Sequence, residues 1–302
     1  MKKLNICYVD PISSNKFTYY ENIKESIKKK SRKFTSLHSI EQLNEKLTNP
    51  NFKPDFILLG YGITNLGNNP LQEISKTNIP KGIFLNKEYS RLDEKLNWIK
   101  NNNFSLAFTV LEKEDEFSEI SKTLFKRVNF AVNPNLFLSR KNEYRYDISF
   151  SGVIREEQDS NIRLKVMEEL FLDPYWYSQR IIFSSHLNDS IKDYRNRIAF
   201  SKMTLSSTGP ADIVGTRYFE VMASNRSVLL CNYKEGIYDN LFENYKDVLM
   251  FEHPSEIKNL YETYIENEEN RKTLLANARK NILKNHTWEH RAEQVIGYIN
   301  EL

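Results

Sequence analysis

The sequence predicts an α/β fold with doubly wound parallel sheets. Short apolar runs alternate with amphipathic helical patterns along nearly the whole chain, which is typical of strands joined by crossover helices. The run FILL at 56–59 is apolar at every position, as in a strand buried on both faces. The alternation breaks once, near residues 133–144, and then resumes. We therefore expect two Rossmann-like domains facing a central cleft, in agreement with a length of 302 residues.

The expected elements follow from this alternation. In the first half, strands are expected at 4–9, 34–37, 56–59, 82–85, 105–108 and 127–131, and helices at 19–30, 39–47, 71–76, 91–100 and 117–124. In the second half, strands are expected at 146–152, 180–184, 203–206, 228–231 and 248–251, and helices at 161–172, 190–200, from 216, at 255–265, 269–285 and 288–302. The predicted domains are 1–132 and 145–285, joined by a linker at 133–144. Packing of a terminal helix, 286–302, back across the domains is one arrangement that this order allows.

The composition is that of an ordinary globular protein, with 40% hydrophobic and 27% charged residues. The 43 basic and 40 acidic side chains nearly balance, which argues against general nucleic-acid binding. No apolar run reaches membrane-spanning length, and the apolar segment before Asp10 is too short for a signal peptide. Cys7 and Cys231 lie in apolar runs, as buried thiols of a reduced protein do. We therefore expect a cytoplasmic enzyme or binding protein.

The stretch 203–225 carries the strongest functional signal. It is predicted to form a strand, a turn and a helix that begins near Gly215, with Thr216 as the expected cap. Arg217 and Glu220 share one face of that helix, just past a strand end, where open α/β sheets bind ligands. A helix N-terminus and an arginine suit phosphate, and a carboxylate suits a sugar diol. A nucleotide site is therefore one interpretation, and a surface Arg–Glu pair is the other.

Four segments occur in order in the second half: FAVNPNLF at 130–137, YDISFSG at 146–152, GTRYFEVMAS at 215–224 and NHTWEHR at 285–291. Together they resemble the GT-B glycosyltransferases, and most of all the family-four-like group that includes the spore-maturation CgeB-type proteins. The first half matches only as a pattern of strands and helices. The resemblance implies a GT-B fold whose second domain holds a nucleotide-sugar donor.

The resemblance also implies roles for single residues. Glu220 matches the glutamate that binds the donor ribose, and Arg217 matches a basic residue near the donor. Asp212 lies eight positions before Glu220, where retaining members carry a second glutamate near the sugar. Gly152 and Arg155 match the first loop of the donor domain, in which a glycine lets the backbone approach and a base neutralises diphosphate.

Further polar side chains lie near the same predicted strand ends. Arg163 is a second candidate for the role of Arg155. His186 follows an apolar strand and could contact phosphate or base, or be solvated. Ser206, Ser207 and Thr208 could hydrogen-bond the nucleotide, or serve only the turn.

The expected chemistry is sugar transfer without a metal or another cofactor. No D-x-D motif occurs, which counts against the metal-dependent GT-A class. Fixed positive groups, namely a helix N-terminus with Arg155 and Arg217, would stabilise the leaving diphosphate. Asp10, at the end of the first predicted strand, is the candidate base for the acceptor hydroxyl; capping of the turn at Pro11 is the simpler interpretation. Retention or inversion at the anomeric carbon stays open.

Residues 286–290 spell H-x-x-E-H, the order of inverzincin metalloproteases, through His286, Glu289 and His290. Thr287 is expected to begin a helix, so the two histidines need not share a helical face. Docking of a terminal helix explains the same residues, and we favour that interpretation.

A basic run lies on the first predicted helix and just after it. Its members are Lys24, Lys28, Lys29, Lys30, Arg32 and Lys33. Such a run is usually a solvated helix face. The alternatives are contact with an anionic acceptor, peripheral contact with the inner membrane face, or contact with DNA.

The leading hypothesis is a glycosyltransferase that moves a sugar from a nucleotide-sugar donor to a glycan, lipid-linked or protein acceptor. A sugar-nucleotide epimerase of the same fold, a DNA-base glycosyltransferase and a non-catalytic nucleotide-sugar-binding module are the alternatives. Neither G-x-x-x-x-G-K-[ST] nor G-x-G-x-x-G occurs, so kinase-like and dinucleotide enzymes have little support.

Overall fold

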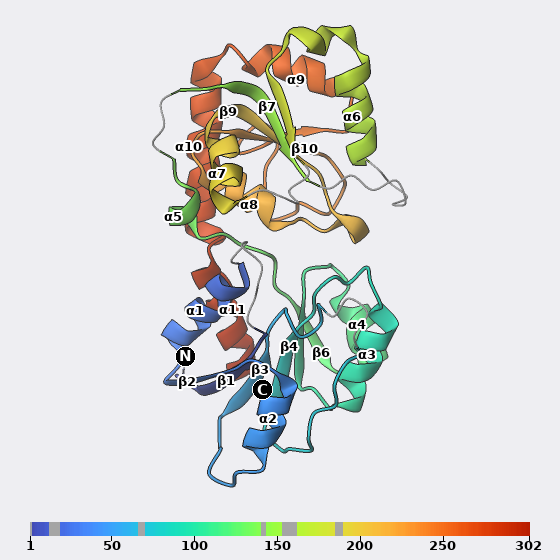
Figure 1. The fold of residues 1–302 in the computed structure, drawn as a ribbon, viewed down its shortest axis with the longest axis vertical. Helices are drawn as coiled ribbons and strands as arrows, with labels where there is room; N and C mark the ends of the chain where they lie inside the picture. Colours follow the sequence, from blue (N-terminus) through green and yellow to red (C-terminus); the bar gives the residue numbers. More distant parts are fainter. Residues whose placement is uncertain (1, 12–18, 66–69, 140–142, 153–161, 185–189) are drawn as a thin grey trace. The chain divides into compact units, whose positions relative to one another are not determined.

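The computed structural model describes residues 2–11, 19–65, 70–139, 143–152, 162–184 and 190–302 (Figure 1). Contacts between residues divide the chain into two units. Unit 1 comprises Met1–Phe130 and Trp288–Leu302, and unit 2 comprises Ala131–Thr287. The chain therefore passes between the units twice, at the beginning and at the end of unit 2.

Unit 1 is built on a parallel sheet. Its described strands are β1 (Asn5–Val9), β2 (Lys33–Leu37), β3 (Phe56–Leu59), β4 (Lys81–Phe84), β5 (Leu106–Thr109) and β6 (Leu124–Arg127). They lie in the order β2-β1-β3-β4-β5-β6. Cys7 of β1 pairs with Thr35 of β2 and with Ile57 of β3, so β1 and β3 are central strands. All four residues of β3 are buried, as its uniformly apolar sequence predicts.

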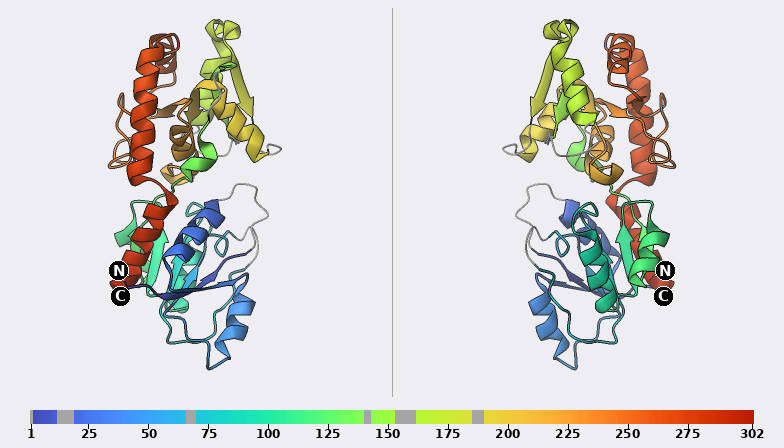
Figure 2. Two further views of the ribbon diagram at one scale, coloured as in Figure 1. Left: turned by 90° about the vertical axis from the view of Figure 1, so that its left-hand side faces the viewer. Right: turned by 90° about the vertical axis from the view of Figure 1, so that its right-hand side faces the viewer.

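Helices cover both faces of this sheet. They are α1 (Tyr19–Lys30), α2 (Ile40–Leu47), α3 (Leu92–Asn101), α4 (Glu114–Ser121) and α11 (Trp288–Asn300). Leu43 of α2, Leu96 of α3 and Phe117 of α4 join Cys7 and Val9 in one apolar cluster, so these three helices pack on the same face. Helices α1 and α11 pack against each other, and Figure 2 shows α11 and α2 on opposite sides of the sheet.

Two elements of unit 1 differ from the prediction. Residues 71–76 form no helix, because side chains from elsewhere bind their backbone. The Ile74 N–H donates to Asn102 Oδ1 at 2.9 Å, and the Ser75 N–H donates to Asn44 Oδ1 at 2.8 Å. The strand predicted at 127–131 is β6, which begins earlier because Lys122 ends α4 with a left-handed φ of 56°.

Unit 2 is built on a second parallel sheet. Its described strands are β7 (Tyr146–Ser151), β8 (Ile181–Ser184), β9 (Ser201–Ser206), β10 (Val228–Asn232) and β11 (Leu249–Phe251), in the order β11-β10-β9-β7-β8. Its helices are α5 (Pro134–Phe137), α6 (Ile162–Leu172), α7 (Ile191–Ala199), α8 (Thr216–Ala223), α9 (Glu256–Tyr264) and α10 (Glu268–Asn285), with 3-10 turns η1 (Pro174–Ser178) and η2 (Pro210–Asp212). The short elements α5, η1 and η2 were not predicted. Because every strand pair is parallel, the carboxyl ends of the strands lie at one edge.

The two faces of the second sheet differ in chemistry. On one face, Phe150 and Leu205 belong to an apolar cluster that includes Val166 of α6. The residues that alternate with them carry hydroxyl groups. Thr204 lies between Ser149 and Ser227, with oxygen–oxygen distances of 3.0 and 2.7 Å. Buried hydroxyl groups therefore bond to one another beneath the polar edge of the sheet.

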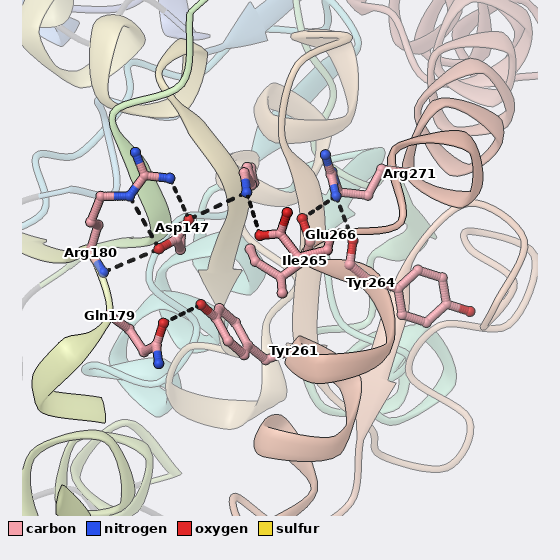
Figure 3. Close-up of polar contacts among 9 residues, drawn as sticks. Asp147, Gln179, Arg180, Tyr261, Tyr264, Ile265, Glu266 and Arg271 are labelled. Atoms are coloured by element: carbon pink, nitrogen blue, oxygen red, sulfur yellow. Dashed lines mark hydrogen bonds and ion pairs between the residues drawn. The ribbon is translucent and has the colours of Figure 1, made fainter. Parts of the chain in front are cut away.

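The amino-terminal edge of this sheet is held by charged side chains (Figure 3). Asp147, 5% exposed, receives two hydrogen bonds from the Arg180 side chain, at 2.8 and 3.3 Å, and lies 3.7 Å from Lys202 Nζ. Lys202 also pairs with Glu266 at 3.1 Å. Nearby, Arg271 donates to the carbonyl groups of Tyr264, the last residue of α9, and of Ile265, which follows it. These contacts fix the end of the sheet that open α/β proteins do not use for ligands.

Two parallel sheets with interleaved helices confirm the predicted α/β fold class. Cys7 and Cys231 are buried free thiols. Across the described segments, no helix combines the length and apolar character needed to span a membrane.

Candidate functional site

Arginine side chains gather at the carboxyl edge of the sheet in unit 2. Arg163 of α6 donates through Nε to Ser207 Oγ at 2.9 Å, just after β9. Arg197 of α7 donates through Nη1 to Ser151 Oγ at 2.8 Å, at the end of the neighbouring strand β7. Each guanidinium group carries five N–H donors and a permanent positive charge. Two helices thus bring positive charge to two adjacent strand ends.

Arg217 of α8 adds a third guanidinium group at Gly152, directly after β7. A Cβ atom at Gly152 would lie 3.3 Å from Arg217 Nη1 and 3.1 Å from the ring of Phe150. Such contacts are closer than ordinary side-chain packing allows, so glycine permits the arginine to lie over the end of the strand. The prediction grouped Gly152 and Arg217 in one donor site, and the structure brings them together.

Glu220 is the carboxylate of this cluster. It lies one turn after Arg217 on α8 and is half-buried. Tyr194 Oη of α7 donates to Glu220 Oε2 at 2.7 Å. Burial raises the pKa of Glu220, and the Tyr194 hydroxyl, the Arg217 charge and the Thr216 hydroxyl oppose that rise. A single acceptor group therefore lies among several donors.

Helix α8 begins differently from the prediction. Gly215, not Thr216, is its N-cap, and glycine has no side chain to cap the first N–H groups. Thr216 is the first helical residue. A Cβ atom at Gly215 would have no neighbour within 4 Å in the described part of the chain, so this helix end is spacious. Uncapped N–H groups at a helix start attract anions.

The serines and threonine after β9 have distinct surroundings. Ser206 Oγ is buried and has no hydrogen-bond partner within the described residues. Ser207 accepts from Arg163, as described above. The Thr208 N–H donates to Asn232 Oδ1 at 3.0 Å, and Asn232 Nδ2 donates to Thr208 Oγ1 at 3.4 Å, which joins the turn to the end of β10.

Asp212 lies in a tight turn between β9 and α8. Its φ is 59°, after Ala211 at 55°, and its carboxylate pairs with Lys234, which follows β10. The Asp212 N–H donates to the Gly209 carbonyl at 3.1 Å, and Gly209 in turn donates to the Ile213 carbonyl at 2.9 Å. Backbone bonds and an ion pair thus hold the second predicted carboxylate.

Asp10 belongs to unit 1, where it directly follows β1. It is 5% exposed, and its Oδ1 accepts from the Gly62 N–H at 2.7 Å. A Cβ atom at Gly60 or Gly62 would lie 2.4 Å from an Asp10 atom, so the loop after β3 closes tightly around this carboxyl group. Burial raises the pKa of Asp10 to about 7, although the Gly62 N–H opposes that rise. The Asp10 carboxyl group is thus hydrogen-bonded to the backbone of the loop after β3.

Two predicted site residues lie outside the part of the chain that the structure describes, and three residues at the site were not predicted. Arg155 and His186 lie outside the described residues. Tyr194, Arg197 and Lys234 were not predicted as site residues; Tyr194 contacts Glu220, Lys234 contacts Asp212, and Arg197 contacts Ser151, which precedes Gly152. Tyr194 and Arg197 lie three positions apart on one predicted helix, and this shared helical face was the available signal.

Two residues of the H-x-x-E-H sequence, His286 and Glu289, have partners within the fold. The His286 ring is 3% exposed and lies 5.5 Å from the Phe219 ring and 6.0 Å from the Phe242 ring, centroid to centroid. Glu289 pairs with Lys29 at 3.7 Å. Among the residues that the structure describes, no three His, Cys, Asp or Glu side chains are grouped as metal ligands would be.

The basic run of α1 is largely ion-paired. Lys30 pairs with Glu293 of α11 at 2.7 Å and, with the Lys29–Glu289 pair, joins the two helices. Arg32 pairs with Asp55 at 3.5 Å. Lys24 and Lys28 pair with glutamates on their own helix. These carboxylates offset most of the positive charge of the run.

Comparison with solved structures identifies the fold as GT-B. HepE from Anabaena, in complex with UDP and glucose, is 12% identical with a TM-score of 0.61, and the alignment covers 99% of this chain and 100% of HepE. An E. coli structure described as trehalose-6-phosphate bound with UDP-2-fluoro glucose is 10% identical with a TM-score of 0.61, covering 98% of this chain and 99% of that one. A TarM variant from S. aureus, in complex with fondaparinux, alpha-GlcNAc-glycerol and UDP, is 12% identical with a TM-score of 0.55, covering 81% and 55%.

Sequence comparison gives two further findings. Collagenase ColT of Clostridium tetani is 27% identical over 129 residues, which are 42% of this chain and 12% of ColT. The chain thus spans only a small part of that relative. The family described as glycosyl transferase-like matches residues 140–297, more than half of the chain, including all of α6 to α10. The protein therefore belongs to the glycosyl transferase-like family and has the GT-B fold.

Proposed function

We propose that the protein transfers a sugar from a nucleoside-diphosphate sugar, and that the carboxyl edge of the unit 2 sheet holds this donor. The observation that carries the proposal is the contact of Arg217 with Gly152 beside the carboxylate of Glu220. Cations suit the two phosphates and a carboxylate suits the ribose hydroxyl groups. UDP is named in the HepE and E. coli complexes, so uridine diphosphate is the first carrier to test.

In this proposal, Arg163, Arg197 and Arg217 surround the diphosphate with the uncapped start of α8. Arg163 and Arg197 are already oriented by hydrogen bonds to Ser207 and Ser151, which lowers the cost of ordering them when the ligand binds. The same groups stabilise the charge that develops on the diphosphate as the glycosidic bond breaks. Fixed cations therefore take the role that a divalent metal has in other glycosyltransferases, and the reaction is metal-independent.

The acceptor side of the proposal concerns unit 1. Asp10, with its raised pKa, is the base that accepts the proton of the acceptor hydroxyl. The acceptor is a glycan, a lipid-linked acceptor or a protein, and the CgeB-type group is the proposed subgroup. Asp212 is the second proposed catalytic carboxylate, and its ion pair with Lys234 holds it beside the start of α8.

Direct binding tests the donor site. Isothermal titration with UDP, UDP-glucose, GDP and ADP should give saturable binding of UDP and its sugar. Glu220→Gln keeps the size of the side chain but loses the charge, and should weaken UDP binding about tenfold, as expected for a hydrogen bond to a charged group. Glu252→Gln, an exposed change outside the site, is the matched control. Absence of binding by all four nucleotides, with the protein folded, would contradict the proposal.

A further inference from the structure

Tyr194 connects the carboxylate of the donor site to a rigid aromatic contact. It lies on α7 and is 1% exposed. Its ring meets the Phe137 ring of α5 edge-on, with centroids 6.1 Å apart and an interplanar angle of 78°. Its hydroxyl donates to Glu220 Oε2 at 2.7 Å. A buried tyrosine has two side-chain torsions, and here packing restrains both.

We propose that Tyr194 is a positioning residue of the donor site: it holds the Glu220 carboxylate in the orientation and the ionised form that accept the ribose hydroxyl groups. This inference rests on the proposed donor site and adds to it a residue that touches no substrate. A glutamate has three side-chain torsions, so without a partner it would lose more conformational entropy when the ligand binds. Tyr194 removes that freedom before the nucleotide arrives.

The second part of the proposal concerns charge. A protonated Glu220 presents one acceptor fewer to a diol, so binding needs the carboxylate. Burial favours the protonated form and raises the pKa of Glu220, whereas the Tyr194 hydroxyl stabilises the ionised form. Removal of this hydroxyl therefore raises the pKa of Glu220 further. Nucleotide binding should then be lost at a higher pH than in the wild type.

The other groups near Glu220 do not replace Tyr194. On α7, Arg197 is bonded to Ser151, and on α8 the charge of Arg217 and the hydroxyl of Thr216 also favour ionisation. Helix α10, which packs against α8, directs Arg279 to the Ala223 carbonyl and His286 to the Phe219 ring. Helix α5, with sequence PNLF, brings no ionisable side chain. Tyr194 is thus the neighbour from another helix that bonds directly to the carboxylate in the described residues.

The test is Tyr194→Phe, which keeps the ring against Phe137 and removes only the hydroxyl. UDP binding is measured by isothermal titration at a series of pH values from about 6 to about 9, all of them above the ordinary glutamate pKa. We expect the variant to bind UDP roughly tenfold more weakly at the acidic end of this series, and by a smaller factor at the basic end, where the loss of orientation remains. Thermal unfolding of each variant at each pH confirms that the measured protein is folded.

Two controls separate positioning from general destabilisation. Tyr261→Phe removes another buried hydroxyl, which donates to Gln179 Oε1 at 2.6 Å at the opposite edge of the sheet, and should leave the pH profile of UDP binding unchanged. In a Glu220→Gln background, which has no carboxylate to titrate, Tyr194→Phe should cause no pH-dependent loss. Equal affinity of Tyr194→Phe and wild type, or an equal loss at every pH, would overturn the inference. Failure of the wild type to bind UDP would instead overturn the proposed donor site.

Discussion

Gly152 and Arg217 lie so close that a methyl group on Gly152 would be 3.3 Å from Nη1 of the arginine. This relationship joins the end of β7 to the start of α8, two segments far apart in sequence. The position of the Arg217 guanidinium group therefore depends on the absence of a side chain at Gly152. Substitution of Gly152 by alanine tests this dependence.

Gly152→Ala should weaken UDP binding about tenfold, because the methyl group displaces Arg217 or the Phe150 ring and a hydrogen bond to a charged group is lost. Isothermal titration measures the change. Gly82→Ala is the matched control, since its methyl group would lie 2.8 Å from Phe56 in unit 1. That variant should lose about 1–3 kcal/mol of stability and bind UDP normally. Normal binding by Gly152→Ala would contradict the prediction.

Arg197→Ala should weaken UDP binding by about 10- to 100-fold, because it removes a pre-oriented cation from the proposed diphosphate site. Arg197→Lys should recover only part of the affinity, since an ammonium group cannot bond to Ser151 and a phosphate with the same fork geometry. Arg145→Ala is the control, because the Arg145 side chain belongs to the same unit and is 56% exposed. This variant should bind UDP with nearly wild-type affinity. Similar losses for Arg197→Ala and Arg145→Ala would argue against a specific diphosphate contact.

Asp10→Asn should slow sugar transfer by about 10²- to 10⁴-fold, the usual contribution of a general base. With Asp10 present, the transfer rate should rise with pH through about 7, where burial places the pKa of this carboxyl group. The rate is measured as UDP release in the presence of an acceptor. Near-normal transfer by the variant would contradict a catalytic role. The role of Asp10 would then be structural, through its hydrogen bond with the Gly62 N–H.

The Asp10 carboxyl group should make the protein less stable as the pH rises, whereas a salt-bridged carboxyl group makes a protein more stable. Its folded pKa is raised, so its contribution to stability is complete below the ordinary aspartate pKa, about 3.9, and is lost as the pH rises through about 7. Asp10→Asn should therefore flatten the dependence of unfolding free energy on pH between about 4 and 7. Urea titrations at several pH values measure the slope, and an unchanged slope would contradict the raised pKa.

Asp147→Asn should destabilise the protein by about 1–3 kcal/mol without changing UDP binding. Burial of Asp147 opposes its ionisation, but hydrogen bonds and charge from Arg180, with Lys202, outweigh it and lower the pKa. In the wild type, Asp147 contributes this stability above the ordinary aspartate pKa. The contribution disappears as the pH falls through the lowered pKa of Asp147. The magnitude is moderate because the Arg180 side chain is 52% exposed. Glu266→Gln, at a side chain 84% exposed, should change stability by less than about 0.5 kcal/mol.

Sugar transfer should be insensitive to EDTA, because arginines and a helix N-terminus are proposed to stabilise the leaving diphosphate. The assay compares UDP release before and after chelation, and again after addition of Mg²⁺ or Mn²⁺. Loss of activity with EDTA and its return with either ion would show that the proposed cations are insufficient.

Local sequence patterns predicted most elements but not all of their ends. The apolar run at 56–59 predicted β3 because burial on both faces leaves a distinct composition. Residues 71–76 have a helical pattern, yet Asn44 and Asn102 bind their backbone from other elements. No pattern within a single segment reveals such distant partners.

In the proposed site, the spacing of Arg217 and Glu220 predicted one shared helix, and both residues lie on α8. Tyr194 meets Glu220, and Lys234 meets Asp212, only after the chain has folded. Such pairings depend on tertiary geometry, which spacing along the chain does not contain.

The loop around Asp10 has a consequence for the variation that this protein can tolerate. Because Gly60 and Gly62 leave no space for a methyl group beside the carboxyl group, a longer acidic side chain at position 10 would displace that loop. The three positions should therefore be replaced together or kept together in natural variants, and a homologue with an alanine at 60 or 62 should carry a smaller residue at 10.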